Sequence, residues 1–156
     1  MLRKIPPKKI RASGGNFAIV ASRYNARYVE AMLRAAQSEL KRAGGKVQVI
    51  RVPGAYEIPV VTAKLARTSS PPLSAIICLG VILRGATMHA QHIGEAVSNA
   101  LAQIQIQYEI PIIHEVLLLE NETQARERCL GKKHNRGKEA AQTALEMARV
   151  MKSLRG

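Results

Sequence analysis

Four short aliphatic runs, each followed by a segment of different periodicity, constrain the fold of this 156-residue chain more than any other feature. The runs are FAIVAS (17–22), KVQVIRV (46–52), AIICLGVIL (75–83) and IPIIHEVLLL (110–119). Strands that alternate with helices form right-handed crossovers, which place the strands parallel in one sheet and cover both of its faces. The sequence therefore predicts one α/β domain over residues 16–156, with a four-stranded parallel sheet, after a basic N-terminal arm over residues 1–15.

The segments between these runs have the residue spacing of helices. In the first segment Val29, Met32, Leu33, Ala36 and Leu40 form one apolar stripe, which ends at a glycine pair. Residues 53–67, 120–129 and 140–151 are predicted to contain further helices. The predicted helix over 89–108 has no Lys or Arg, so we expect it to be buried, in part against another subunit.

The composition excludes several kinds of site. The formal net charge is +13, which favours phosphates, nucleic acids or acidic surfaces as partners. All eleven acids are Glu, which argues against two-metal and EF-hand sites. Cys78 and Cys129 have no metal-ligand spacing and favour a reducing compartment. The sequence shows neither a signal peptide nor an apolar run of about 18 residues, so we expect a soluble, cytoplasmic protein without a metal.

Polar residues follow the first three predicted strands, at Arg23–Asn25, Gly54–Glu57 and Arg84–His89. The carboxyl ends of parallel strands meet at one edge of a sheet, where ligands usually bind. Amides of residues 85–87, ahead of a helix, suit an anion, and His89 can transfer protons near neutral pH. Each residue alone also has a structural explanation, such as a helix cap, but their joint position favours a pocket.

Four segments resemble the lumazine synthase family in order and spacing. They are VPGAYEIP (52–59), GVILRGATMH (80–89), ERCLGKKHNRGKEAA (127–141) and ALEMA (144–148). The resemblance spans roughly residues 16–152 and implies a flavodoxin-like three-layer α/β/α sandwich. It also implies a transferase that condenses 5-amino-6-(D-ribitylamino)uracil with 3,4-dihydroxy-2-butanone 4-phosphate. The products are 6,7-dimethyl-8-ribityllumazine, phosphate and water, in the penultimate step of riboflavin biosynthesis, with no cofactor.

The resemblance also assigns roles to residues of this chain. His89 is the proton-transfer residue. The residues expected to bind the pyrimidine and its ribityl chain are Tyr24, Ala55, Tyr56, Glu57, Val81, Ile82, Leu83 and His114. Those expected to bind the phosphate are Gly85, Ala86, Thr87 and Arg128, with Lys132 and Arg136 as further basic positions nearby.

His114 and Glu115 depart from the family, which has an apolar or aromatic residue and then a small one at these positions. By resemblance, His114 approaches the pyrimidine from a neighbouring subunit. We expect cations nearby to lower the pKa of His114.

The family implies a homopentamer with active sites between adjacent subunits, in some members built into a hollow icosahedral shell, and riboflavin synthase as a candidate partner. The alternative function is a binding module whose basic loops hold RNA or a flavin without turnover. Net charge favours this alternative, whereas an aromatic content of 3% argues against RNA binding by stacking. Turnover of the two substrates distinguishes the two functions.

Overall fold

The computed structural model describes residues 14–155, so residues 1–13 of the predicted N-terminal arm lie outside the described part of the chain. The elements follow one another as β1 (Asn16–Ser22), α1 (Ala26–Arg42), β2 (Lys46–Val52), a 3₁₀ turn η1 (Ala55–Glu57), α2 (Ile58–Thr68), β3 (Ala75–Leu83), α3 (His89–Tyr108), β4 (Ile112–Leu119), α4 (Glu122–Cys129) and α5 (Arg136–Ser153). Strands and helices alternate in the predicted order.

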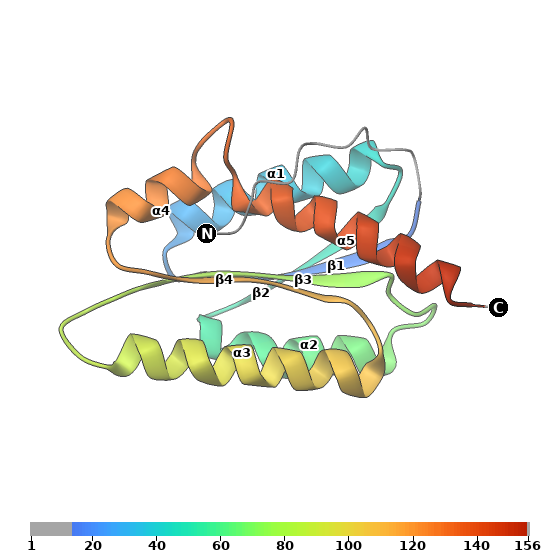
Figure 1. Ribbon diagram of the computed structural model, residues 1–156, viewed down its shortest axis with the longest axis horizontal. Coiled ribbons are helices and arrows are strands. Elements are labelled where there is room, and N and C mark those ends of the chain that lie inside the picture. Colours follow the sequence, from blue (N-terminus) through green and yellow to red (C-terminus); the bar gives the residue numbers. More distant parts are fainter. Residues whose placement is uncertain (1–13, 156) are drawn as a thin grey trace.

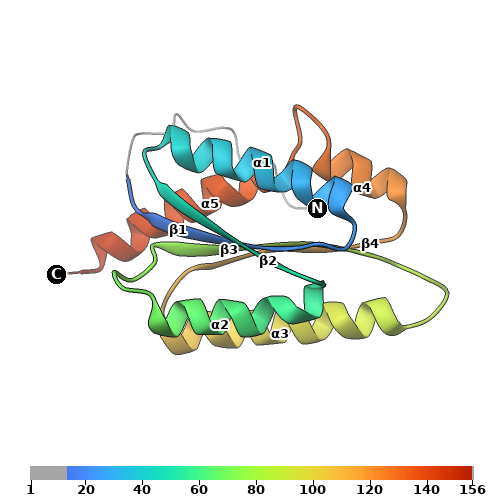
Figure 2. The same cartoon turned by 180° about the vertical axis from the view of Figure 1, so that it is seen from behind.

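The four strands form one parallel sheet in the order β2-β1-β3-β4. Helices α2 and α3 cover one face of the sheet, and α1, α4 and α5 cover the other (Figure 1). The view from behind shows the same three layers (Figure 2). The predicted three-layer α/β/α sandwich with a four-stranded parallel sheet is confirmed.

Each face of the sheet has its own apolar core. The core under α1, α4 and α5 includes Phe17, Ile19, Leu33, Ile77 and Leu145. The core under α2 and α3 includes Val20, Ile58, Ile76, Val97 and Leu101. Strands β1 and β3 contribute to both cores, which explains why their sequences are continuous aliphatic runs rather than alternating ones.

Helices α1 and α5 lie in backbone contact at Gly137. A Cβ atom at this position would lie 2.0 Å from the carbonyl oxygen of Met32. Asn135, two residues before Gly137, caps α5 through its side-chain oxygen, and its side-chain Nδ2 donates to the carbonyl of Cys129 at 2.8 Å. This contact fixes the start of α5 against α1 and α4.

Some element bounds differ from the prediction. Within residues 53–67 the helix α2 begins at Ile58, so that Pro59 lies in its first turn, and a separate 3₁₀ turn that ends at Glu57 precedes it. The last strand begins at Ile112 rather than at residue 110, and α4 begins after its capping residue Asn121. In the single chain α3 is largely exposed rather than buried, and Ile106 retains 76% of its accessible surface.

Candidate active site

A pocket of about 630 Å³ lies at the carboxyl edge of the sheet. It is lined by Tyr24, Asn25, Gly54, Ala55, Tyr56, Glu57, Val81, Ile82, Leu83, His89 and Ile93. The structure thus brings together every residue assigned to the pyrimidine and ribityl chain except His114, along with the proton-transfer candidate His89. Asn25 and Ile93 are lining residues that the sequence did not assign to a ligand.

The wall formed by Tyr24 depends on the glycine beside it. The amide of Tyr24 donates to the carbonyl of Pro53 at 3.1 Å, which ties the turn after β1 to the end of β2. A Cβ atom on Gly54 would lie 2.9 Å from the Tyr24 ring, so Gly54 makes room for the ring rather than for a ligand. The tyrosine side chain itself is 68% exposed and can present its face to a planar ring.

Glu57 has a structural contact within the same wall. One of its carboxylate oxygens, Oε2, accepts a hydrogen bond from the amide of Gly54 at 3.1 Å and closes the 3₁₀ turn. The side chain as a whole is exposed. This contact gives Glu57 a structural role in the turn, and Oε1 remains an acceptor for hydroxyl groups of a ligand.

His89 is the first residue of α3, and the three residues assigned to phosphate precede this helix. Gly85, Ala86 and Thr87 are exposed, and the amide of His89 donates to Thr87 Oγ1 at 3.3 Å. A Cβ atom on Gly85 would meet nothing within 4 Å, so the backbone there is open to a ligand. The amino end of a 20-residue helix carries a partial positive charge that favours an anion.

The basic residues assigned to the phosphate lie in the other helical layer and do not line the pocket of their own chain. Arg128 is exposed in the last turn of α4, and Lys132 is exposed in the loop that follows. Arg136 begins α5 and pairs with two carboxylates, Glu115 and Glu139, each at 3.4 Å.

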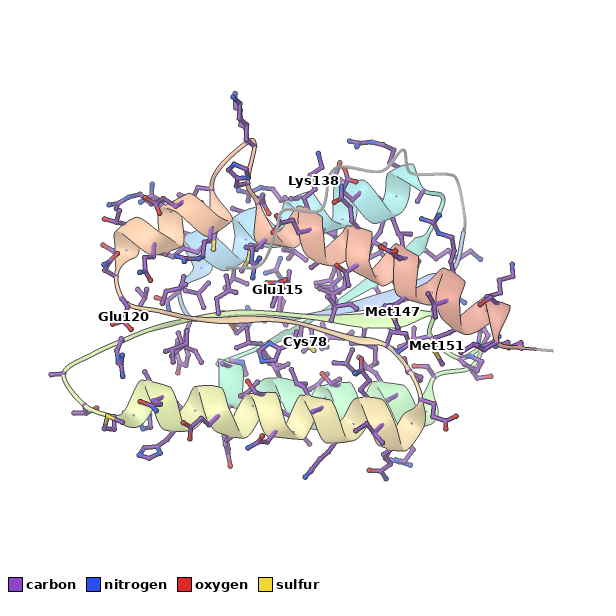
Figure 3. All side chains as sticks on the ribbon, viewed as in Figure 1. Cys78, Glu115, Glu120, Lys138, Met147 and Met151 are labelled. Carbon is purple, nitrogen blue, oxygen red and sulfur yellow. The ribbon has the colours of Figure 1, made fainter. Side chains whose placement is uncertain are left out.

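Glu115, which the sequence noted as a departure from the family, is a partly buried carboxylate. It extends from β4 toward α4 and α5 and lies between the sheet and these helices (Figure 3). Burial raises its pKa to about 7, against the opposing effect of Arg136. A charged residue inside an aliphatic run is the sequence signal for such a group.

His114 lies in a second hollow, on the other side of α3 from the pocket. This hollow of about 600 Å³ includes Ser98, His114 and Leu118. His114 Nε2 lies 2.7 Å from Ser98 Oγ, and Nδ1 accepts from the amide of Val116. The pKa of His114 is lowered, as expected, and within this single chain burial is the largest cause.

Residues 14–155 contain no group of three His, Cys or acidic side chains placed to share a metal ion. Within the same range no helix is long and apolar enough to cross a membrane. Cys78 and Cys129 are both buried free thiols, and burial raises the pKa of each.

The pocket therefore offers an aromatic face, strand-end backbone groups, a carboxylate and an imidazole around one space. The turn at its mouth offers backbone amides to an anion. Such a set suits the binding of a planar, hydroxylated ring next to a phosphorylated molecule, with proton transfer between them.

A protein-family model described as 6,7-dimethyl-8-ribityllumazine synthase matches residues 14–152. A protein of Aquifex aeolicus with the name 6,7-dimethyl-8-ribityllumazine synthase is 41% identical over 150 residues, which cover 94% of this chain and 96% of the relative. A protein of Clostridium kluyveri with the same name is 37% identical over 154 residues, covering 97% of this chain and 99% of the relative.

Proposed function

The chain belongs to the 6,7-dimethyl-8-ribityllumazine synthase family, and we propose that it carries out that reaction in the pocket beside β3. The reaction joins 5-amino-6-(D-ribitylamino)uracil to 3,4-dihydroxy-2-butanone 4-phosphate, the penultimate step of riboflavin biosynthesis. The observation that supports this assignment is the gathering of Tyr24, Ala55–Glu57, Val81–Leu83 and His89 around one space. These residues come from four separate segments of the chain.

The chemistry requires binding, orientation and proton transfer. The amine of the pyrimidine condenses with the ketone, phosphate leaves by elimination, and the second ring closes with loss of water. Tyr24 would stack on the pyrimidine, the 55–57 turn would hold the ribityl hydroxyls, and the 85–87 amides would hold the phosphate. Orientation and anion stabilisation would supply most of the acceleration. Proton transfer by His89 would add about 10²–10⁴-fold.

We propose that a neighbouring subunit completes each site, in a homopentamer. The assigned residues His114, Arg128, Lys132 and Arg136 all lie outside the pocket of their own chain. The exposed α3 supports this proposal, because a helix with no Lys or Arg and with Ile106 at the surface is suited to contact another subunit. The two buried free thiols agree with a cytoplasmic location.

The direct test mixes the purified protein with both substrates and follows lumazine absorbance and phosphate release. We expect both products to appear together, and neither substrate alone to give them. A protein that releases no phosphate from the butanone phosphate but shifts RNA in a salt-sensitive manner would instead be a binding module.

Shared sites have a separate test. His89→Ala and Arg128→Ala chains are purified separately, unfolded and refolded together. If each site combines His89 of one subunit with Arg128 of the next, mixed oligomers contain sites with both residues intact and regain activity at low butanone phosphate. Activity equal to the average of the two separate variants would show that each chain supplies its whole site.

A further inference from the structure

Asn25, which joins β1 to α1, has a backbone conformation that few residues tolerate. Its φ and ψ angles are 59° and 43°, in the left-handed region. Asn enters this region more readily than most residues other than glycine. Its carbonyl oxygen accepts hydrogen bonds from the amides of Tyr28 at 3.0 Å and Val29 at 3.2 Å. The backbone of Asn25 therefore starts α1.

The side chain of Asn25 bridges to a strand 56 residues away. Its Nδ2 donates to the carbonyl oxygen of Val81 at 2.7 Å. Strand β1 pairs with β3 only as far as Ala21 and Leu79, whereas β4 pairs with β3 as far as Leu83. Up to Leu79, backbone amides of β1 donate hydrogen bonds to β3. At Val81, the side-chain amide of Asn25 donates in their place. Val81 is 3% exposed, and a buried carbonyl of this kind needs a hydrogen-bond partner.

This bond joins two walls of the pocket. Asn25 and Val81 both line it, Tyr24 directly precedes Asn25, and Ile82 and Leu83 directly follow Val81. The planar ring of a bound pyrimidine would lie between the Tyr24 ring and the backbone of the 81–83 segment. The separation and tilt of these two surfaces decide how well the ring is held.

We propose that Asn25 is a positioning residue for the pyrimidine subsite. It holds the end of β3 at a fixed distance from the Tyr24 turn through one side-chain hydrogen bond. This inference rests on the proposed function and adds to it a residue that acts through Val81. The amides assigned to the phosphate, at 85–87, lie beyond the anchored segment and outside the pocket lining, so the effect is specific to the pyrimidine.

Two variants separate the hydrogen bond from the backbone conformation. Asn25→Asp keeps the size of the side chain but replaces the donor with a carboxylate that faces the Val81 carbonyl. Asn25→Gly removes the side chain and adopts the left-handed conformation freely. Glu109→Gly is the matched control, because Glu109 has a φ of 53° at the end of α3 and does not line this pocket.

Steady-state kinetics with both substrates are the first measurement. We expect the KM for the pyrimidine to rise about ten-fold in Asn25→Asp and about three- to ten-fold in Asn25→Gly, the range for loss of one hydrogen bond. The KM for the butanone phosphate and kcat with both substrates saturating stay within about two-fold of the parent values, which is the signature of lost substrate binding. Glu109→Gly leaves all three constants unchanged.

An unchanged pyrimidine KM in both variants would overturn the proposal. Similar rises in both KM values, together with a fall in kcat, would also overturn the proposal, since these changes indicate general damage to the fold. If Asn25→Asp fails to fold, Asn25→Gly decides.

Amide hydrogen exchange gives a second reading that does not depend on turnover. Exchange over residues 81–84 should be faster in Asn25→Gly than in the parent, and Glu109→Gly should match the parent. Unchanged exchange there would overturn the anchoring role of Asn25. A parent chain that forms no lumazine would count against the proposed function, while this exchange measurement still tests Asn25.

Discussion

Replacing Gly137 with Ala should destabilise the protein, because the new methyl group has no space. A Cβ at this position would lie 2.0 Å from the carbonyl oxygen of Met32, while ordinary contact begins at 3.4 Å. Helices α1 and α5 therefore have to separate by more than about 1 Å, and overpacking of this kind costs about 3 kcal/mol. Ala favours the helical conformation more than Gly does, and this offsets at most about 1 kcal/mol of the loss in stability. The net loss of about 2 kcal/mol lowers Tm by roughly 4–8 °C in a domain of this size.

The assay is thermal and urea unfolding of the parent and two variants in the same oligomeric state. Gly94→Ala is the matched control, since it makes the same change within α3, where the nearest atom to a new Cβ is Leu118 Cδ2 at 3.6 Å. There the added methyl should be neutral or stabilise the protein by about 0.5–1 kcal/mol. A Gly137→Ala protein with a Tm equal to or above that of the parent would refute the steric reasoning.

Four further predictions concern the site and its surroundings. Arg128→Ala should raise the KM for the butanone phosphate ten-fold or more, for loss of a charge-assisted contact worth about 1.5–3 kcal/mol. Arg149→Ala, which removes an exposed cation elsewhere on α5, should not. His89→Ala should slow lumazine formation by about 10²–10⁴-fold without abolishing it. His114→Phe should bind the pyrimidine at least as well as the parent and lose the weakening at acidic pH, where the parent histidine becomes charged. Burial raises the pKa of Glu115 from 4.5 to about 7, so this group's contribution to stability falls as pH rises through that window. Glu115→Gln should therefore show a flatter stability profile between those pH values.

Each of these outcomes has a clear contrary result. Kinetic constants for Arg128→Ala equal to those of the parent would show that Arg128 is a surface charge that does not bind the phosphate. Complete inactivity of a folded His89→Ala protein would show that His89 does more than transfer a proton. Superimposable pyrimidine-affinity curves for parent and His114→Phe across acid to neutral pH would place His114 outside the site. Identical pH-stability profiles for parent and Glu115→Gln would show that Glu115 ionises as freely in the folded chain as in the unfolded one.

The fold and the gathering of strand-end residues at one edge followed from the sequence because both depend on rules of wide generality, whereas Val81, Ile82 and Leu83 were assigned through the family resemblance. Alternation of strands and helices specifies a parallel sheet, and a parallel sheet brings the residues after its strands to one edge. Tyr24, Glu57 and His89 could therefore be placed near one another without knowledge of any side-chain contact. The elements themselves were predicted to within a few residues.

The remaining features depend on contacts between segments far apart in the sequence. The bond from Asn25 to Val81 arises where β1 stops and β3 continues, and no local pattern reports that mismatch in length. The pairing of Glu115 with Arg136 depends on which face of β4 meets α5. Strand-end reasoning also says nothing of Arg128, which lies on a helix of the outer layer.

Because α3 separates the pocket from the hollow around His114, each subunit has two different surfaces to offer its neighbours. A contact that joins the pocket of one copy to the hollow of the next is head-to-tail. If the sites are shared in this way, as proposed, an isolated chain has no complete catalytic centre, and an open row of copies leaves one centre incomplete at its end. Only a closed ring would then complete every centre. Turnover per chain would measure ring closure, and it should increase sharply at the protein concentration where the ring forms.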